Sequence, residues 1–141
     1  MLVGFVRPAM TAEYMEKNDF QKKFAFSPGV ITKGGRIVWL AGVTALRDES
    51  GKDISGQFEP QVRVIFNDID KQLKKAGGNL ANVVTMTIYV TDPRYIERFA
   101  ELRREMFKDG NYPASTFIAV SNLPIPGLLV EIQGTAVIGE N

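Results

Sequence analysis

The sequence predicts an α+β fold, in which a mixed β-sheet carries two helices on one of its faces. Two segments place apolar residues at helical spacing, and five others alternate or run apolar as strands do. In chain order these segments read β-β-α-β-α-β-β. Two amphipathic helices can cover only one face of such a sheet, so the other face is left for a different partner.

The chain length fits one domain preceded by an extension. A chain of 141 residues can bury a sizeable core within a single domain. The pattern over residues 1–23 is weak, apart from a short helical segment near Thr11–Lys17. We therefore expect an irregular amino-terminal extension over residues 1–23 and a single domain over residues 24–141.

Two strands are expected before the first helix. Phe24–Val30 is predicted as the first strand, although Pro28 and Gly29 interrupt it. The pair Gly34-Gly35 is a hairpin signal. The segment 37–43 is then apolar on both faces, which predicts a central, buried strand.

Both helices are predicted from apolar stripes and from residues that favour helix ends. The first runs from Phe58 to Ala76, where Gly77-Gly78 ends it. The second follows Asp92-Pro93, a capping residue and a proline that suits the first helical position, and runs to about Lys108. The two stripes are, in order, Phe58, Val62, Ile65, Phe66, Ile69 and Leu73, and then Tyr95, Phe99, Leu102 and Met106.

Three further strands complete the predicted sheet. Val83–Thr91 alternates between apolar residues and residues that carry hydroxyl groups. Ala114–Val120 and Leu128–Ile138 follow the second helix. An apolar face that the helices leave uncovered favours burial against a second subunit. The residues predicted on that face are Tyr89, Phe117, Leu129 and Val137.

The composition excludes several kinds of chemistry. Lys and Arg total 17 against 16 Asp and Glu, so net charge gives no reason to expect a nucleic-acid or membrane partner. The absence of cysteine and histidine removes disulfides, thiol nucleophiles, histidine-assisted catalysis and most zinc sites. We expect no metal or other cofactor. No secretory signal or long apolar segment is recognisable, and a cytoplasmic location is expected.

Several segments resemble the YjgF/RidA family. They are the strand ending Leu40-Ala41-Gly42, the run Tyr112-Pro113-Ala114-Ser115-Thr116, the Leu123-Pro124 loop and the closing strand Val130–Ala136. The resemblance covers residues 24–138 and is most specific near the carboxy terminus. It implies a chorismate-mutase-like fold and a homotrimer whose sheets form a central barrel, with small-molecule sites in the clefts between subunits. It also implies hydrolysis of reactive enamines and imines to keto acids and ammonia.

The resemblance transfers the family's site residues unevenly. The family motif has a carboxylate-binding arginine where this chain has Ser115, and a hydroxyl cannot form the bidentate pair of a guanidinium. Phe26 replaces a tyrosine of the family pattern, and Phe117 replaces a cysteine. Gly42 is retained, and Glu131 keeps the acid of the last strand. The resemblance therefore implies a divergent member with a non-standard substrate specificity.

Glu131 is the candidate catalytic residue. A partly buried carboxylate can hold the attacking water and transfer protons during imine hydrolysis. By sequence position alone, a glutamate on a strand is more often a surface or interface carboxylate paired with Lys or Arg. The family resemblance favours the catalytic role.

Five residues are candidates for binding the substrate. Hydroxyl side chains can donate hydrogen bonds to a ligand, although they also simply suit a strand. Aromatic residues are more often plain core than cleft wall, and a strand glycine either admits a ligand or relieves packing. The five candidates are Phe26, Gly42, Ser115, Thr116 and Phe117.

The arginines of the second helix are predicted to form a solvated surface. No aromatic residues interleave with them on that surface, which argues against a nucleic-acid site. No Arg or Lys is recognisable as a substitute for the missing carboxylate-binding arginine. The four residues of this predicted basic surface are Arg94, Arg98, Arg103 and Arg104.

Two function classes remain open. The first is an enzyme that hydrolyses a reactive imine to a carbonyl product and ammonia, acting on a substrate larger and less acidic than 2-aminoacrylate. The alternative is a non-catalytic trimer of the same fold that binds a small molecule or has a regulatory role. A ribonuclease, the name given to some relatives, ranks third because the charge is balanced and histidine is absent.

Overall fold

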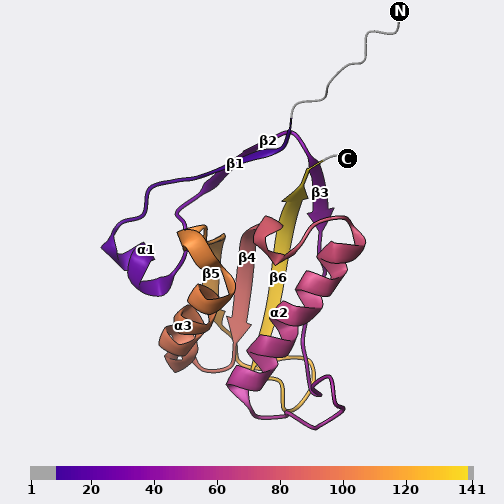
Figure 1. The fold of residues 1–141 in the computed structure, drawn as a ribbon. Helices are drawn as coiled ribbons and strands as arrows, with labels where there is room; N and C mark the ends of the chain where they lie inside the picture. The colour runs from indigo at the N-terminus through magenta and orange to yellow at the C-terminus, as the bar shows by residue number, and fades with distance from the viewer. Residues whose placement is uncertain (1–8, 140–141) are drawn as a thin grey trace, which may run out of the picture.

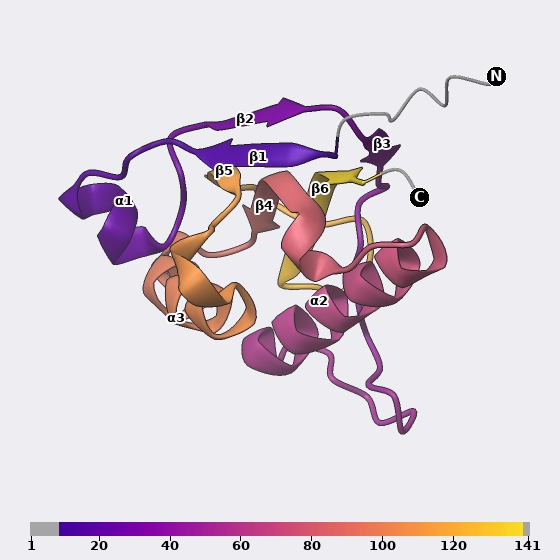
Figure 2. The same cartoon turned by 45° about the horizontal axis from the view of Figure 1, so that its top comes forward.

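The chain folds around a four-stranded mixed sheet with two helices on one face (Figure 1). The computed structural model describes residues 9–139. A separate two-stranded sheet, formed by β1 (Thr11–Tyr14) and β2 (Val30–Lys33), crosses one end of the four strands (Figure 2). The predicted α+β class is confirmed. Residues 1–8 of the predicted extension lie outside the described residues, and the boundary between residues 23 and 24 stays a prediction.

The main sheet has the strand order β3-β6-β4-β5. β3 is Arg36–Trp39, β4 is Val83–Val90, β5 is Ala114–Ala119 and β6 is Val130–Ile138. β6 pairs antiparallel with both β3 and β4, whereas β5 pairs parallel with β4. A parallel pair needs a crossover connection, which the helix α3 (Ile96–Met106) supplies (Figure 1).

Both predicted helices are present, with their apolar sides turned toward the sheet. α2 spans Phe58–Lys75 and α3 spans Ile96–Met106, and every residue of the predicted α2 stripe is buried. Gly77 adopts a φ of 90° and lets the Gly78 amide donate to Leu73 O at 2.9 Å, so the glycines end α2 as predicted. Within residues 9–139, no helix combines the length and the apolar character needed to cross a bilayer.

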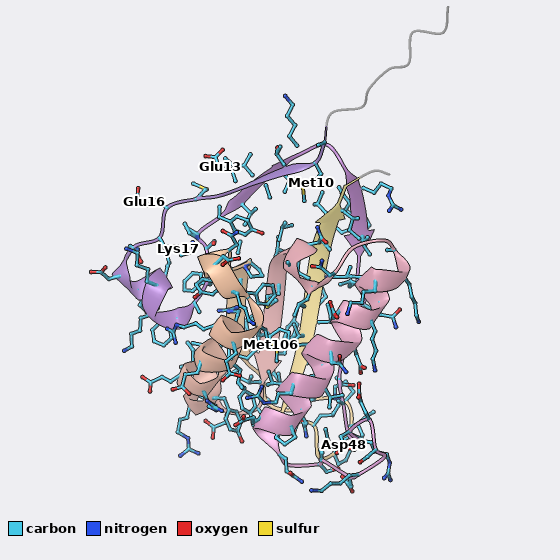
Figure 3. All side chains as sticks on the ribbon, in the orientation of Figure 1. Met10, Glu13, Glu16, Lys17, Asp48 and Met106 are labelled. Carbon is cyan, nitrogen blue, oxygen red and sulfur yellow. The ribbon has the colours of Figure 1, made fainter. Side chains whose placement is uncertain are left out.

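The core lies between the sheet and these two helices. Ile88 of β4 and Ile132 of β6 are fully buried beneath them. The rings of Phe66 and Phe99 lie with their centroids 5.9 Å apart, and Met106 packs against the core between α3 and α2 (Figure 3). Burying a large apolar side chain contributes about 1.5–3 kcal/mol. This layer therefore fixes both helices on one face and leaves the opposite face open.

The segment before the main sheet differs from the prediction. β1, Thr11–Tyr14, is a strand where the sequence predicts a short helix. The helix lies later, at α1, Asp19–Phe24. There the Asn18 side chain accepts from the Gln21 amide at 2.9 Å, and the Gln21 side chain accepts from the Asn18 amide at 2.8 Å. This capping box was the signal for α1, and the apolar pattern alone misses it.

The turn at Gly34-Gly35 does not form the predicted hairpin. Both glycines have positive φ, 73° and 81°, as a tight turn requires. The strand before them, β2, is Val30–Lys33 and pairs with β1, whereas β3 pairs with β6. The strand predicted over Phe24–Val30 is also wrong, because α1 ends at its first residue and β2 begins at its last.

β3 lies at an edge of the sheet and not at its centre. Val38 faces the core, but Ile37 and Trp39 are 55% and 76% exposed. Apolar residues on both faces of this strand predict that both faces are buried. The single chain buries only one of them. The prediction of a central strand is wrong, whereas the prediction of an uncovered apolar face is confirmed.

The open face carries a different set of apolar residues from the predicted one. Phe117 points toward α3, with its ring centroid 5.8 Å from that of Phe99, because the register sets it beside the buried Ile88. Val137 is already buried within the chain. The next residue of β5, Ile118, is the one left exposed. The predicted face of Phe117 is therefore wrong, whereas Val137 lies on the predicted face, opposite Ile37 of β3, but is covered within the chain.

Candidate functional site

Two separate cavities contain the six candidate site residues. The first, of about 420 Å³, holds the predicted catalytic residue and is called the Glu131 cavity; it is lined by Gly42, Tyr89, Val120, Asn122, Leu123, Pro124, Glu131 and Gln133. The second, of about 270 Å³, is called the Arg103 cavity; it is lined by Phe20, Phe24, Phe26, Ile96, Phe99, Arg103, Ser115, Thr116 and Phe117. One chain thus separates Glu131 from four of the five predicted binding residues.

An irregularity in the chain beside β6 shapes the Glu131 cavity. The Leu40 amide donates to Gly134 O at 3.3 Å, and the Val43 amide donates to Ile132 O at 2.9 Å. Between these two bonds the chain advances by three residues on this segment but by only two residues on β6. The segment 40–43 contains one extra residue, which makes a β-bulge of the kind that often borders functional sites.

Gly42 lies in this bulge and directly approaches Glu131. A Cβ atom at position 42 would overlap Glu131 Oε1. Any larger residue would therefore displace the carboxylate. The room that the Glu131 side chain needs explains the glycine at position 42. The Glu131 side chain is half-buried, and Tyr89 of β4 is its neighbour across the sheet.

Glu131 has no cationic partner within residues 9–139. The ion pairs of this part of the chain use other carboxylates, such as those of Glu59 and Asp92. The side chain of Gln133, two residues further along β6, is already hydrogen-bonded to the backbone. Its Nε2 donates to Leu40 O at 3.2 Å and to Gly134 O at 3.1 Å. The Glu131 carboxylate is therefore available to a water or a ligand, unlike the paired surface carboxylate that its sequence position alone favours.

The Arg103 cavity lies between α3, β5 and the segment that follows α1. The Ser27 amide donates to Pro113 O at 3.1 Å, which holds the segment after α1 beside the start of β5. This contact brings Phe26 over the cavity, where its ring meets that of Phe20 edge-on with centroids 6.0 Å apart. The walls of the cavity are therefore mostly aromatic.

Arg103 is the one charged residue lining this cavity, and its burial corrects a prediction. It is 3% exposed, although the sequence places it on a solvated basic surface. Nη1 donates to Ser115 Oγ at 2.7 Å and Nη2 donates to Phe24 O at 3.0 Å. The guanidinium carbon lies 4.9 Å from the Phe99 ring centroid. Burial lowers the pKa of Arg103 to about 9, which leaves the guanidinium charged at neutral pH.

The spacing along α3 contains the signal for this burial. Arg103 follows Phe99 by four residues and precedes Met106 by three, so it falls within the apolar stripe of the helix. Its charge alone groups it with Arg94 and Arg98, which do form ion pairs at the surface. Helical position, not residue type, separates the buried arginine from the solvated ones.

A third hollow holds none of the candidate residues. It is a groove of about 970 Å³ beside α2, and Figure 3 shows Asp48 in the loop at one end of the molecule that contributes to it. Its charged side chains pair with one another or with neighbours, as Asp70 does with Lys74 at 2.7 Å. Among residues 9–139, no group of three or more Asp or Glu residues is arranged to hold a metal ion.

Comparison with known proteins establishes the family. The family model described as endoribonuclease L-PSP matches residues 16–138. The chain belongs to this family. A RutC family protein from Aquifex aeolicus is 35% identical over 102 residues, which cover 72% of this chain and 80% of the relative. The resemblance to YjgF/RidA proteins that the sequence motifs indicate is confirmed.

Solved structures of Rid proteins share the fold of this endoribonuclease L-PSP family member. A Rid family protein of unknown function from Yersinia pestis superposes with a TM-score of 0.76 at 26% identity, over 92% of this chain and 98% of that chain. RidA from the Antarctic bacterium Psychrobacter gives a TM-score of 0.66 at 28% identity, over 80% and 88% of the two chains. The mixed sheet and its helices are therefore those of the YjgF fold.

Proposed function

We propose that this Rid-family chain hydrolyses a reactive imine to a carbonyl product and ammonia, with Glu131 as the acid–base residue. The observation that carries the proposal is the Glu131 carboxylate, which has no ion-pair partner within residues 9–139 and lies half-buried against the bulge at Gly42 in a cavity. A positioned carboxylate is the proton-transferring group that imine hydrolysis needs. Family membership supports the same class of chemistry.

The proposed reaction consumes one water and uses Glu131 twice. Glu131 accepts a proton from water while the oxygen attacks the imine carbon, and it passes that proton to the nitrogen to give a carbinolamine. It then accepts the hydroxyl proton and delivers it to the same nitrogen. The C–N bond breaks, ammonia leaves, and the carbonyl product keeps the oxygen of the water. The carboxylate is regenerated at the end, as general acid–base catalysis requires.

We further propose that the site is completed in a homotrimer. The face that carries Glu131 also exposes Trp39 and Ile37 of β3. Covering apolar surface stabilises an interface by roughly 25 cal/mol for each Å² removed from water. A neighbouring chain on this face would bury both side chains and close the Glu131 cavity from the open side.

The substrate is proposed to differ from small imino acids of the 2-aminoacrylate type. Ser115 stands where the family motif has its carboxylate-binding arginine, and a hydroxyl cannot replace that charge. Ser115 also lies on the helix side of the sheet, bonded to Arg103, whereas Glu131 lies on the open side. The residues beside Glu131 therefore favour a less acidic substrate.

The test is ammonia release from a series of imines of increasing side-chain size. Glu131→Gln is expected to lower turnover about a hundredfold or more, because one acid–base group is lost. Light scattering should show the same assembly mass for the variant and the unmodified protein. Glu13→Gln is the matched control, since it makes the same change on β1, where Glu13 projects from the edge of the molecule (Figure 3).

Two outcomes contradict the proposal. Unchanged turnover of Glu131→Gln in an intact assembly would remove Glu131 from the mechanism. An unmodified protein that releases no ammonia from any imine of the series would favour a non-catalytic binding trimer.

A further inference from the structure

We infer that Tyr89 is a second functional residue of the Glu131 cavity, and that its hydroxyl donates a hydrogen bond to the oxygen that forms on the imine carbon. This inference rests on the proposed hydrolysis. Glu131 moves the protons, whereas Tyr89 stabilises the new oxygen and holds it in the carbonyl product. The cavity should therefore also bind uncharged carbonyl compounds.

The pairing of β4 with β6 brings Tyr89 and Glu131 together. The two residues are direct partners in the antiparallel register, and both line the Glu131 cavity. Residues opposite one another in such a pair have Cβ atoms about 4.5–5.5 Å apart on the same face. Ile88 and Val90, the neighbours of Tyr89 along β4, are fully buried in the core, so Tyr89 faces the open side of the sheet. Two strands of the main sheet therefore place a phenol and a carboxylate at one cavity.

The Tyr89 hydroxyl has no hydrogen-bond partner among residues 9–139. The hydroxyl groups that form side-chain hydrogen bonds there are those of Ser27, Ser50 and Ser115. A tyrosine also suits a strand through its ring alone, so its presence on β4 does not by itself indicate a function. A phenylalanine would supply the same ring, however. The hydroxyl is the part of the side chain that packing does not require, and it is available to donate to a ligand.

The cavity offers few other groups that can donate to a developing oxygen. Among the residues within 9–139 that line it, none is Lys or Arg, and the Glu131 carboxylate only accepts. Gln133 already uses its Nε2 to donate to Leu40 O and Gly134 O. Asn122 is exposed in the loop that follows β5, and a loop positions a side chain less precisely than a strand does. Tyr89 is therefore the side-chain donor best placed to bind the oxygen.

The role of Tyr89 requires no proton transfer of its own. As water attacks, the C–O bond forms, the π electrons of the C–N double bond move to nitrogen, and Glu131 carries the proton. The phenol keeps its hydrogen and only shares it with the oxygen. Such a donor accelerates a reaction because its bond is stronger in the transition state than in the bound imine, which has no oxygen at this point.

The first experiment measures kcat and KM for ammonia release by Tyr89→Phe. We expect kcat to fall roughly tenfold to a hundredfold, below most oxyanion donors because this oxygen carries only partial charge. KM should stay within about threefold, since the lost bond forms only after the water attacks. Tyr95→Phe is the matched control, because the Tyr95 ring stacks on Phe58 with centroids 4.1 Å apart, beyond the residues that line the cavity. It should leave both constants within about twofold.

The second experiment needs no turnover and titrates the protein with cyclohexanone, an uncharged ketone, followed by nuclear magnetic resonance. The unmodified protein is expected to bind the ketone at millimolar concentration. Tyr89→Phe should weaken that binding about fivefold, as the loss of one hydrogen bond predicts. Glu131→Gln and Tyr95→Phe should leave it within about twofold.

The two readouts separate this inference from the proposed hydrolysis. An unchanged kcat or an unchanged ketone affinity in folded Tyr89→Phe overturns the role of Tyr89, even if Glu131→Gln abolishes turnover. Equal losses in Tyr95→Phe overturn it as well. A protein that releases no ammonia but loses ketone affinity in Tyr89→Phe contradicts the hydrolysis alone, and the oxygen-binding role of Tyr89 stands.

Discussion

The two cavities of this chain differ in how much of each site one chain provides. The Glu131 cavity lies on the open face of the sheet, beside exposed apolar residues that a neighbour is proposed to cover. The Arg103 cavity is formed by α3, β5 and the segment around α1, with its charge buried. The Glu131 carboxylate is therefore open to a neighbouring chain, whereas the Arg103 guanidinium is already enclosed by its own chain.

The largest expected effect comes from placing a charge on the open face. Trp39→Glu should reduce the assembly to single chains, because burying an unpaired carboxylate at an interface is costly. Turnover should fall by about a hundredfold, since the catalytic geometry would no longer be completed. Light scattering and ammonia release measure the two effects.

Trp39→Phe is the control for that experiment, because it keeps an apolar side chain at the position. An assembly that survives Trp39→Glu would show that the neighbour does not cover β3. Full turnover by single chains would show instead that the Glu131 cavity needs no partner.

The next effect concerns a buried polar side chain that is fully satisfied, in contrast to Arg103. Gln61 of α2 donates to Ile54 O at 2.9 Å and to Gly127 O at 2.8 Å, and it accepts from the Leu129 amide at 2.9 Å. Gln61→Leu would leave these three backbone groups without that partner. We expect a loss of about 3 kcal/mol in the free energy of unfolding, measured with denaturant at fixed protein concentration.

The control for Gln61 is Gln57→Leu, which removes one long bond of 3.5 Å from an exposed position. Its effect should stay within about 0.5 kcal/mol. Equal effects of the two substitutions would mean that the network of Gln61 does not hold the loops that precede β6.

The smallest effect tests the close approach of Gly42 to Glu131. Gly42→Ala should displace the carboxylate and lower turnover about tenfold, with the assembly mass unchanged. Gly139→Ala is the control, because a Cβ there would make an ordinary contact of 3.9 Å. Retained turnover in Gly42→Ala would indicate that the position of Glu131 in the chain is not the one used in the reaction.

Much of the fold was predictable from the sequence. α2, α3, β4 and β6 have clear periodicity and strong end signals, and the structure places them close to their predicted bounds. β3 was wrongly predicted as a central strand because its residues are apolar on both faces. Such a pattern indicates burial, but it does not distinguish cover by the same chain from cover by another chain. The segment around α1 was missed because its signal is a local capping box, not an apolar pattern.

The candidate site was predictable only where a motif marks it. Glu131 and Gly42 follow from the family pattern, and the structure brings them together. Ser115 and Thr116 both border the Arg103 cavity, but side chains alternate across a strand, so only the Ser115 side chain faces α3. Arg103 was missed because its residue type suggests solvent, whereas its helical position places it in the apolar stripe.

The most direct test of the account is ammonia release by the unmodified protein as it is diluted from assembled to single chains, with light scattering on the same samples. The account predicts that turnover for each chain falls as the assembly mass falls, because a neighbouring chain is proposed to close the Glu131 cavity. Unchanged turnover in single chains would contradict it.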